Sequence, residues 1–171
     1  MFCQSIKNKV ADLEAVISEH NPDIILGNES WLNPDIGSKE IFPEMYNIYR
    51  KDRFTDSHGG GVSQAIKKDI TITHHTDLDT KCEIIWTQCQ LAGKNSKSIL
   101  LGSYYRPNSS DMESLDQLDA SLLKMNDNIN KDNVIIVGDF NAPDIDWQNP
   151  NVSSICKQHD LTQFVEEPTR R

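Results

Sequence analysis

The sequence predicts an α/β or α+β fold in which helices cover β-sheets. Apolar residues recur at helical spacing over residues 5–20 and again over residues 111–129. Between these two segments, residues 59–105 are rich in Thr and Ile with polar residues between them, which is typical of consecutive strands. Helices that flank a block of strands are expected to pack on the faces of its sheets.

The boundaries of the elements follow from local signals. Ser5 can cap a helix over residues 5–20, and Asn21-Pro22 ends that helix. The Asp-rich start of the helix over residues 111–129 suits the positive end of a helix dipole. Strands are expected over residues 23–27, 62–67, 70–76, 82–91, 98–105 and 134–137, and a last helix over residues 153–165.

Length and composition limit the possible classes of protein. The chain has 171 residues, which fits one domain with its own core. The net charge of −9 disfavours binding that coats nucleic-acid phosphates with basic side chains, but it allows phosphate to be held through a cation at an acidic cleft. No signal peptide or membrane span of about 18 apolar residues is visible. The four cysteines lack metal-ligand spacing and are expected to be reduced thiols of an intracellular protein.

Three polar clusters each follow an apolar strand. Asn28-Glu29 comes after IILG, Tyr105-Arg106 after ILLGSY, and Asp139 with Asn141 after VIIVG. Because the ends of strands that share a sheet lie near one another, these side chains are expected to assemble into one site.

The residue types in these clusters suit phosphate chemistry. Glu29 and Asp139 carry hard oxygen ligands for Mg²⁺, which takes only one or two carboxylates and keeps most of its waters. Asp139 can also orient a water, Asn141 can donate to an anionic oxygen, and Tyr105 can donate a hydrogen bond or assist proton movement. Together they suit metal-assisted attack of water on a phosphate ester.

Each cluster also has a purely structural interpretation. Glu29 can be a turn cap, Tyr105-Arg106-Pro107 a strand-ending turn, and GDFNAP over residues 138–143 an Asx-turn followed by proline. The three glycines at 59–61 favour a hairpin in which strands approach closely.

Other polar residues are interpreted as structural or solvent-exposed. At least one of His74 and His75 is expected to face solvent, because the two are adjacent in an alternating strand. The other histidines have no carboxylate or cysteine at ligand spacing in the sequence. The local basic excess is either a solvated face, which is the favoured interpretation, or a surface that contacts a polyanion; its members are Arg50, Lys51, Arg53, Lys67 and Lys68.

Taken in order, five stretches resemble a known family. They are NPDIILGNESWL, GGGV, SYYRPN, VIIVGDFNAPDIDW and VEEPTRR, and QSIKNKVADLEAVI fits near the start. The chain is similar over almost its whole length to the endonuclease/exonuclease/phosphatase (DNase I-like) superfamily. Within it, the sequence most resembles the apurinic-type endonuclease domain of non-LTR (LINE-type, jockey-like) retrotransposons.

The resemblance implies a four-layered α/β sandwich of two mainly antiparallel sheets between helices. It also implies Mg²⁺- or Mn²⁺-dependent cleavage of DNA, in the nucleus, by a domain that nicks target DNA for a reverse transcriptase in a longer parent chain. By motif, Glu29 matches a metal-binding Glu, and Asp139 matches the Asp that positions or activates the water. Asn141 matches an Asn that contacts the scissile phosphate, and Tyr105 matches an active-site Tyr.

The chain departs from the family pattern at both ends. Phe2 stands where the family usually has an Asn, and the chain ends at Arg171, before an Asp-containing strand and a Ser-Asp-His block. Residues 1–171 are therefore expected to form an incomplete domain that lacks the start of the first strand and the C-terminal strands. Three functions stay open: a DNA-nicking endonuclease, an inactive remnant with a binding or structural role, and a phosphoesterase acting on a small substrate.

Overall fold

The computed structural model describes residues 5–53, 59–90, 97–125, 133–142, 157–162 and 164–165. Short 3-10 turns cover Ile6–Asn8 and Thr76–Leu78. The other elements, in chain order, are α1 (Val10–His20), β1 (Ile24–Asn28), α2 (Ser38–Ile41), β2 (Tyr46–Lys51), β3 (Val62–Lys67), β4 (Thr71–His74), β5 (Glu83–Gln90), β6 (Ser98–Tyr105), α3 (Met112–Lys124) and β7 (Val134–Asp139). No helix among these described residues is both long enough and apolar enough to cross a membrane.

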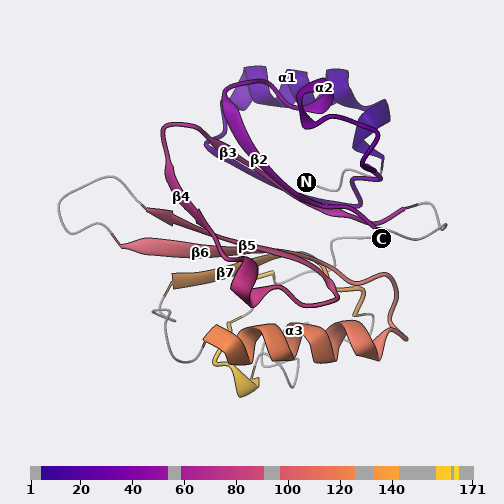
Figure 1. Ribbon diagram of the computed structural model, residues 1–171, viewed down its shortest axis with the longest axis vertical. Coiled ribbons are helices and arrows are strands. Elements are labelled where there is room, and N and C mark those ends of the chain that lie inside the picture. Colours follow the sequence, from indigo (N-terminus) through magenta and orange to yellow (C-terminus); the bar gives the residue numbers. More distant parts are fainter. Residues whose placement is uncertain are drawn as a thin grey trace.

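The strands form two sheets that pack face to face. The first sheet has the order β1-β3-β2 and the second has the order β4-β5-β6-β7. All neighbouring strands are antiparallel except β6 and β7, which are parallel. Figure 1 shows α1 and α2 outside the first sheet and α3 outside the second. The chain therefore has the predicted four-layered α/β sandwich, because each sheet buries one face on the other sheet and one on a helix.

The interface between the sheets combines apolar packing with one buried polar residue. Val62 and Ile66 of β3 face Ile85 and Leu101 of the second sheet, and all four are buried. Gln64 is fully buried between them, and its Nε2 donates to the carbonyl oxygens of Ile85 and Leu101 at 3.1 and 3.2 Å. Its Oε1 accepts from the Thr87 hydroxyl at 2.6 Å. A buried amide with its bonds satisfied fixes the register of one sheet on the other.

The helices close the two outer faces. Leu13 and Ile17 of α1 are buried over the first sheet, as the helical spacing predicts. On the other side, α3 buries Leu118 and Leu122 against the second sheet. The indole nitrogen of the fully buried Trp86 donates to the Ser121 hydroxyl at 2.8 Å, so its one polar atom is satisfied inside the core.

Several predicted boundaries are wrong. Ser5 does not cap α1, because the helix begins at Val10 and the Ser5 hydroxyl accepts from the Asn8 side chain instead. Sequence analysis assigned no element to α2 or β2, where no apolar period is visible. Of the predicted last helix, the described part is helical only at residues 157–158, and residues 161, 162, 164 and 165 are not helical.

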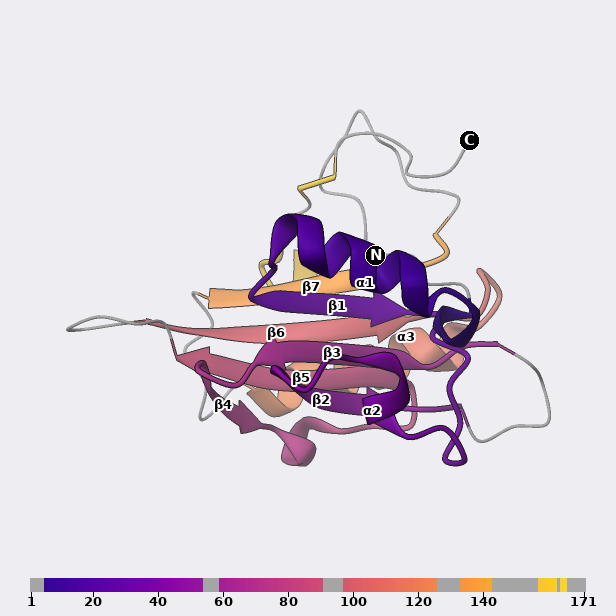
Figure 2. The ribbon, with the colours of Figure 1, turned by 90° about the horizontal axis from the view of Figure 1, so that it is seen from above.

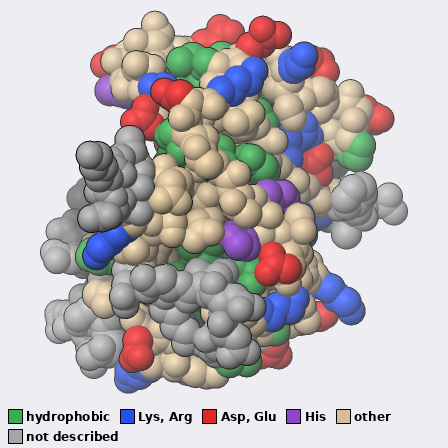
Figure 3. Space-filling view, turned by 60° about the vertical axis from the view of Figure 1, so that its left-hand side comes forward, with side chains coloured by type: hydrophobic (Ala, Val, Ile, Leu, Met, Phe, Trp, Pro, Cys, Tyr) green, Lys and Arg blue, Asp and Glu red, His purple; other side chains and the backbone are tan. Residues whose placement is uncertain are grey.

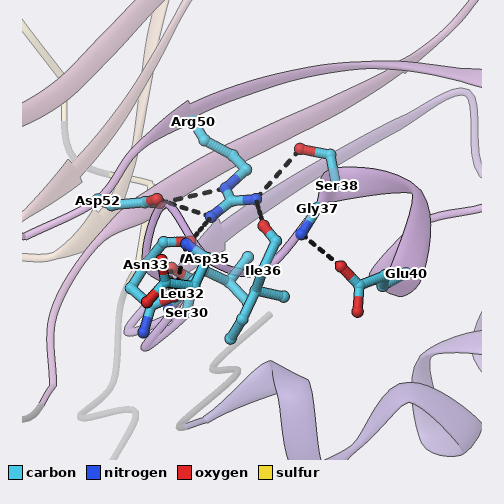
Figure 4. Close-up of polar contacts among 10 residues, drawn as sticks. All are labelled: Ser30, Leu32, Asn33, Asp35, Ile36, Gly37, Ser38, Glu40, Arg50 and Asp52. Carbon is cyan, nitrogen blue, oxygen red and sulfur yellow. Dashed lines mark hydrogen bonds and ion pairs between the residues drawn. The ribbon is translucent and has the colours of Figure 1, made fainter.

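Four of the five basic residues bind other protein groups and do not form a solvated face, whereas Lys68 is exposed as predicted. The Arg50 guanidinium binds Asp52 at 2.6 Å, the carbonyl oxygens of Asn33 and Ile36, and the Ser38 hydroxyl (Figure 4). These bonds pin the segment between β1 and α2 onto β2. Lys51 binds the carbonyl oxygen of Thr80, and Lys67 binds the Asp23 carboxylate. Arg53 binds the Glu83 carboxylate.

Candidate functional site

The ends of β1, β6 and β7 meet at one edge of the sandwich. β1 packs against β6 and β7 across the two sheets, and the three strands lie close together in Figure 2. Tyr105 at the end of β6 pairs with Asp139 at the end of β7 in the parallel register. The Tyr105 hydroxyl crosses to the first sheet and donates to Glu29 Oε1 at 2.7 Å. The predicted convergence of these strand ends is therefore what the structure shows.

Glu29 is held in an unusual backbone conformation just after β1. Its φ of +52° lies in the left-handed region, which is uncommon for residues other than glycine. Its carbonyl oxygen accepts from the Ser5 amide at 3.0 Å. The next two amides, those of Ser30 and Trp31, donate to the carbonyl oxygens of Gly61 and Gly60. Such strain persists where the surroundings impose it, and it often marks a functional site.

Tyr105 is a hydrogen-bond donor at neutral pH. Its side chain is buried, with 6% of its surface exposed. Burial, together with the hydrogen bond to Glu29 and the negative charge of that carboxylate, raises the pKa of Tyr105 to about 12. The phenol therefore stays protonated far above neutral pH, which favours the role of donor over that of proton acceptor.

Asp139 and Asn141 form the turn that ends β7. The Asn141 amide donates to Asp139 Oδ1 at 3.1 Å, which is the Asx-turn that GDFNAP predicts. Asn141 itself has a φ of +40°, and its side-chain Nδ2 donates to the Arg106 carbonyl at 2.6 Å. The Arg106 amide donates in return to the Asp139 carbonyl at 2.9 Å. The turn thus fixes the end of β7 against the end of β6. Contact between Asn141 and a phosphate stays a prediction.

Gly138 permits the close approach of β7 to β6 just before Asp139. A Cβ at this position would lie only 1.7 Å from the Tyr104 carbonyl oxygen. We expect Gly138→Ala to lower the free energy of unfolding by about 3 kcal/mol, since β7 must move away from β6 to relieve the clash. Chemical denaturation of the two proteins measures this. Gly37→Ala is the matched control, because the added Cβ meets only the movable end of the Glu40 side chain.

An ion pair that sequence analysis missed lies beside Tyr105. Arg53 Nε and Glu83 Oε1 are 2.5 Å apart, with 17% and 14% of their side chains exposed. Glu83 Oε2 accepts from the Gly61 amide at 2.5 Å, and the Arg53 guanidinium carbon lies 5.4 Å from the centre of the Tyr105 ring. The one signal in the sequence was a carboxylate at the start of the apolar run Ile84-Ile85-Trp86.

Glu29 is the candidate ligand for a divalent cation at this edge. Among the described residues, no group of three or more His, Cys, Asp or Glu side chains could hold a metal ion. Mg²⁺ needs fewer, because waters and substrate oxygens complete its shell. Glu29 offers a half-buried carboxylate, and its Oε2 accepts no hydrogen bond from the residues that the structure describes. The chemistry of Glu29 therefore fits such an ion.

The described histidines lie away from this edge. His74 is exposed and packs on Tyr49, as the alternation predicts, and His75 Nε2 lies 3.2 Å from Gln88 Oε1. His159, which has no partner in the sequence pattern, lies 2.7 Å from Asp119 on α3. Phe2, at the position of the family's Asn, lies outside the described residues.

Comparison with known proteins identifies the family. A model of the endonuclease/exonuclease/phosphatase family matches residues 3–155, so the chain belongs to this family of phosphoester hydrolases. A search of curated proteins found no significant match.

Solved structures share the fold at low sequence identity. The endonuclease domain of TRAS1, a telomere-specific non-LTR retrotransposon, superposes with a TM-score of 0.65 at 17% identity, over 94% of this chain and 67% of that one. The apurinic endonuclease LMAP of Leishmania major gives a TM-score of 0.64 at 15% identity, over 96% and 61%. The chain thus spans about two thirds of the length of each relative.

Proposed function

We propose that this chain is a divalent-metal-dependent phosphodiester hydrolase that nicks DNA, as the endonuclease domain of a retrotransposon-derived protein. The observation that carries the proposal is the contact of the Tyr105 hydroxyl with Glu29, with Asp139 paired beside Tyr105. The fold shared with the TRAS1 endonuclease domain supports DNA as the substrate. We further propose that residues 1–171 are part of a larger domain, with a reverse transcriptase in the parent chain and a nuclear site of action.

In the proposed chemistry, the residues at the three strand ends have different roles. Glu29 would hold Mg²⁺ or Mn²⁺, which neutralises the charge that builds on the phosphoryl oxygens during hydrolysis. The Asp139 carboxylate, fixed by its turn, orients the attacking water and accepts its proton. The Tyr105 hydroxyl donates a hydrogen bond to Glu29 and so holds that carboxylate in place. Asn141, two residues after Asp139, would contact the phosphate.

The charge distribution favours local contact with DNA over a wide basic footprint. The chain carries 17 basic and 26 acidic residues. On the face shown in Figure 3, acidic and basic side chains are interspersed over the part that the structure describes. DNA binding is therefore proposed to depend on the metal and on few phosphate contacts, so its affinity falls only weakly with added salt.

Two substrates distinguish the open functions. The purified chain is incubated with Mg²⁺ and either supercoiled plasmid or a soluble phosphomonoester. Conversion of the plasmid to the nicked form, abolished by a chelator, supports the proposal. Turnover of the monoester without action on DNA favours a small-molecule phosphoesterase. Activity on neither substrate favours a remnant that retains at most a binding or structural role.

The raised pKa of Tyr105 predicts how nicking depends on pH. Because the phenol stays protonated up to a pKa of about 12, Tyr105 contributes no inflection to the rate between roughly pH 7 and 9. Tyr105→Phe removes the donor to Glu29 and lowers the rate by about tenfold, with the same pH profile. Initial rates across this pH range measure both effects. A basic limb that disappears in Tyr105→Phe would contradict the donor role.

A further inference from the structure

Arg53 presents its guanidinium to the Tyr105 ring, and nothing in the proposed chemistry uses it. The guanidinium carbon lies 5.4 Å from the ring centre, within the range of a cation–π contact. The Tyr105 side chain is also buried, and its hydroxyl is bound to Glu29. The Arg53 guanidinium therefore covers a ring whose position decides whether the hydroxyl reaches Glu29.

Arg53 is itself held in place from the opposite side. Its Nε binds Glu83 Oε1 at 2.5 Å, and Glu83 Oε2 is fixed by the Gly61 amide. This chain of contacts joins the end of β2, the start of β5 and the glycine segment. Arginine suits such a place better than lysine, because its planar fork can bind a carboxylate at one edge and lie against an aromatic ring with its face.

The three glycines make room for this arrangement. A Cβ at Gly60 would lie 2.4 Å from the Arg53 guanidinium carbon, and Gly60 has a φ of +77°. Gly59 and Gly61 also have positive φ values, of +112° and +82°. The sequence GGGV thus does more than turn a hairpin, since its backbone leaves space for Arg53 and binds the partner of Arg53.

One donor of Arg53 has no acceptor among the residues that the structure describes. Arg53 Nη2 is buried and makes no hydrogen bond to any of them. An unsatisfied buried donor lowers stability, so a guanidinium placed only for stability would be expected to bind more oxygens, as Arg50 does. The contacts of Arg53 instead keep its charged guanidinium against the Tyr105 ring.

We propose that Arg53 is a positioning residue for Tyr105, which it holds so that the phenol hydroxyl stays on Glu29. Only the expected effect of Arg53 on the nicking rate rests on the proposed function. The position of the Tyr105 ring can be observed without any reaction.

The test reads the Tyr105 ring directly. The 171-residue chain is labelled with 3-fluorotyrosine, and Tyr105→Phe identifies the fluorine resonance of residue 105. In Arg53→Met this resonance moves at neutral pH, because the guanidinium no longer lies against the ring, and Arg53→Lys restores its position only in part. Arg50→Met is the matched control, because Arg50 of β2 is also a largely buried, ion-paired arginine, but its partner is Asp52. Arg50→Met is expected to leave the resonance of residue 105 in place.

Nicking supplies the second readout. Arg53→Met lowers the rate about tenfold in the parent chain but less than about twofold when Tyr105 is already Phe, since its effect passes through the ring. An unchanged fluorine spectrum in Arg53→Met, or equal effects of Arg53→Met and Arg50→Met on it, overturns the positioning role. A changed spectrum in a chain that nicks no DNA supports the positioning role and overturns the proposed function alone.

Discussion

Asp139→Asn is expected to reduce metal-dependent nicking by about a thousandfold, which corresponds to about 4 kcal/mol of transition-state stabilisation. The substitution removes the carboxylate charge that accepts the proton of the attacking water. It keeps an oxygen where Oδ1 now accepts the Asn141 amide, so the Asx-turn at the end of β7 is preserved. Initial rates on a fluorescent DNA duplex with saturating Mg²⁺ measure the effect.

Stability separates this loss from misfolding. Because the turn survives, Asp139→Asn is expected to change the free energy of unfolding by less than about 1 kcal/mol. Asp139→Ala loses both the charge and the turn, and so it should lose stability as well as activity. A rate for Asp139→Asn within about threefold of the parent would show that Asp139 belongs to the turn and not to the chemistry.

Glu29→Gln is expected to raise the Mg²⁺ concentration needed for half-maximal nicking by at least about tenfold. The glutamine oxygen can still accept from the Tyr105 hydroxyl, so the link between the two sheets is retained. Only the negative charge that a metal ion requires is lost. Rates measured across a range of Mg²⁺ concentrations give the shift, and high Mg²⁺ should restore part of the activity.

Glu40→Gln provides the control for this charge change. Glu40 is exposed and caps α2 through the Gly37 amide at 2.6 Å (Figure 4). It removes one negative charge from the chain and should leave the Mg²⁺ dependence unaltered. If both variants shift the dependence equally, the metal responds to overall charge, and Glu29 does not hold it.

The candidate site could be predicted from sequence wherever the signal was local. Glu29, Tyr105 and Asp139 each follow an apolar strand, and the ends of packed strands lie close together, which the Tyr105–Glu29 bond shows. The Asx-turn at Asp139 also follows from residues two apart. The four layers followed from the family resemblance, which the family match over residues 3–155 confirms.

Contacts between distant residues could not be predicted in this way. Arg53 follows β2 of the first sheet and Glu83 begins β5 of the second, 30 residues away, so no period or spacing relates them. Likewise, Arg50 belongs to a group of basic residues that suggests a solvated face, but its partners include backbone carbonyls up to 17 residues away. The strand β2 has no alternating pattern, because most of its residues are partly buried on both faces.

The central claim is that the ends of β1, β6 and β7 form a metal-dependent site for phosphodiester hydrolysis. The most direct measurement is nicking of supercoiled plasmid by the purified 171-residue chain, run beside Asp139→Asn at equal concentration, with Mg²⁺ and with a chelator. The account predicts nicked plasmid only with the parent chain and Mg²⁺. Equal nicking by Asp139→Asn, or nicking that persists in the chelator, would contradict it.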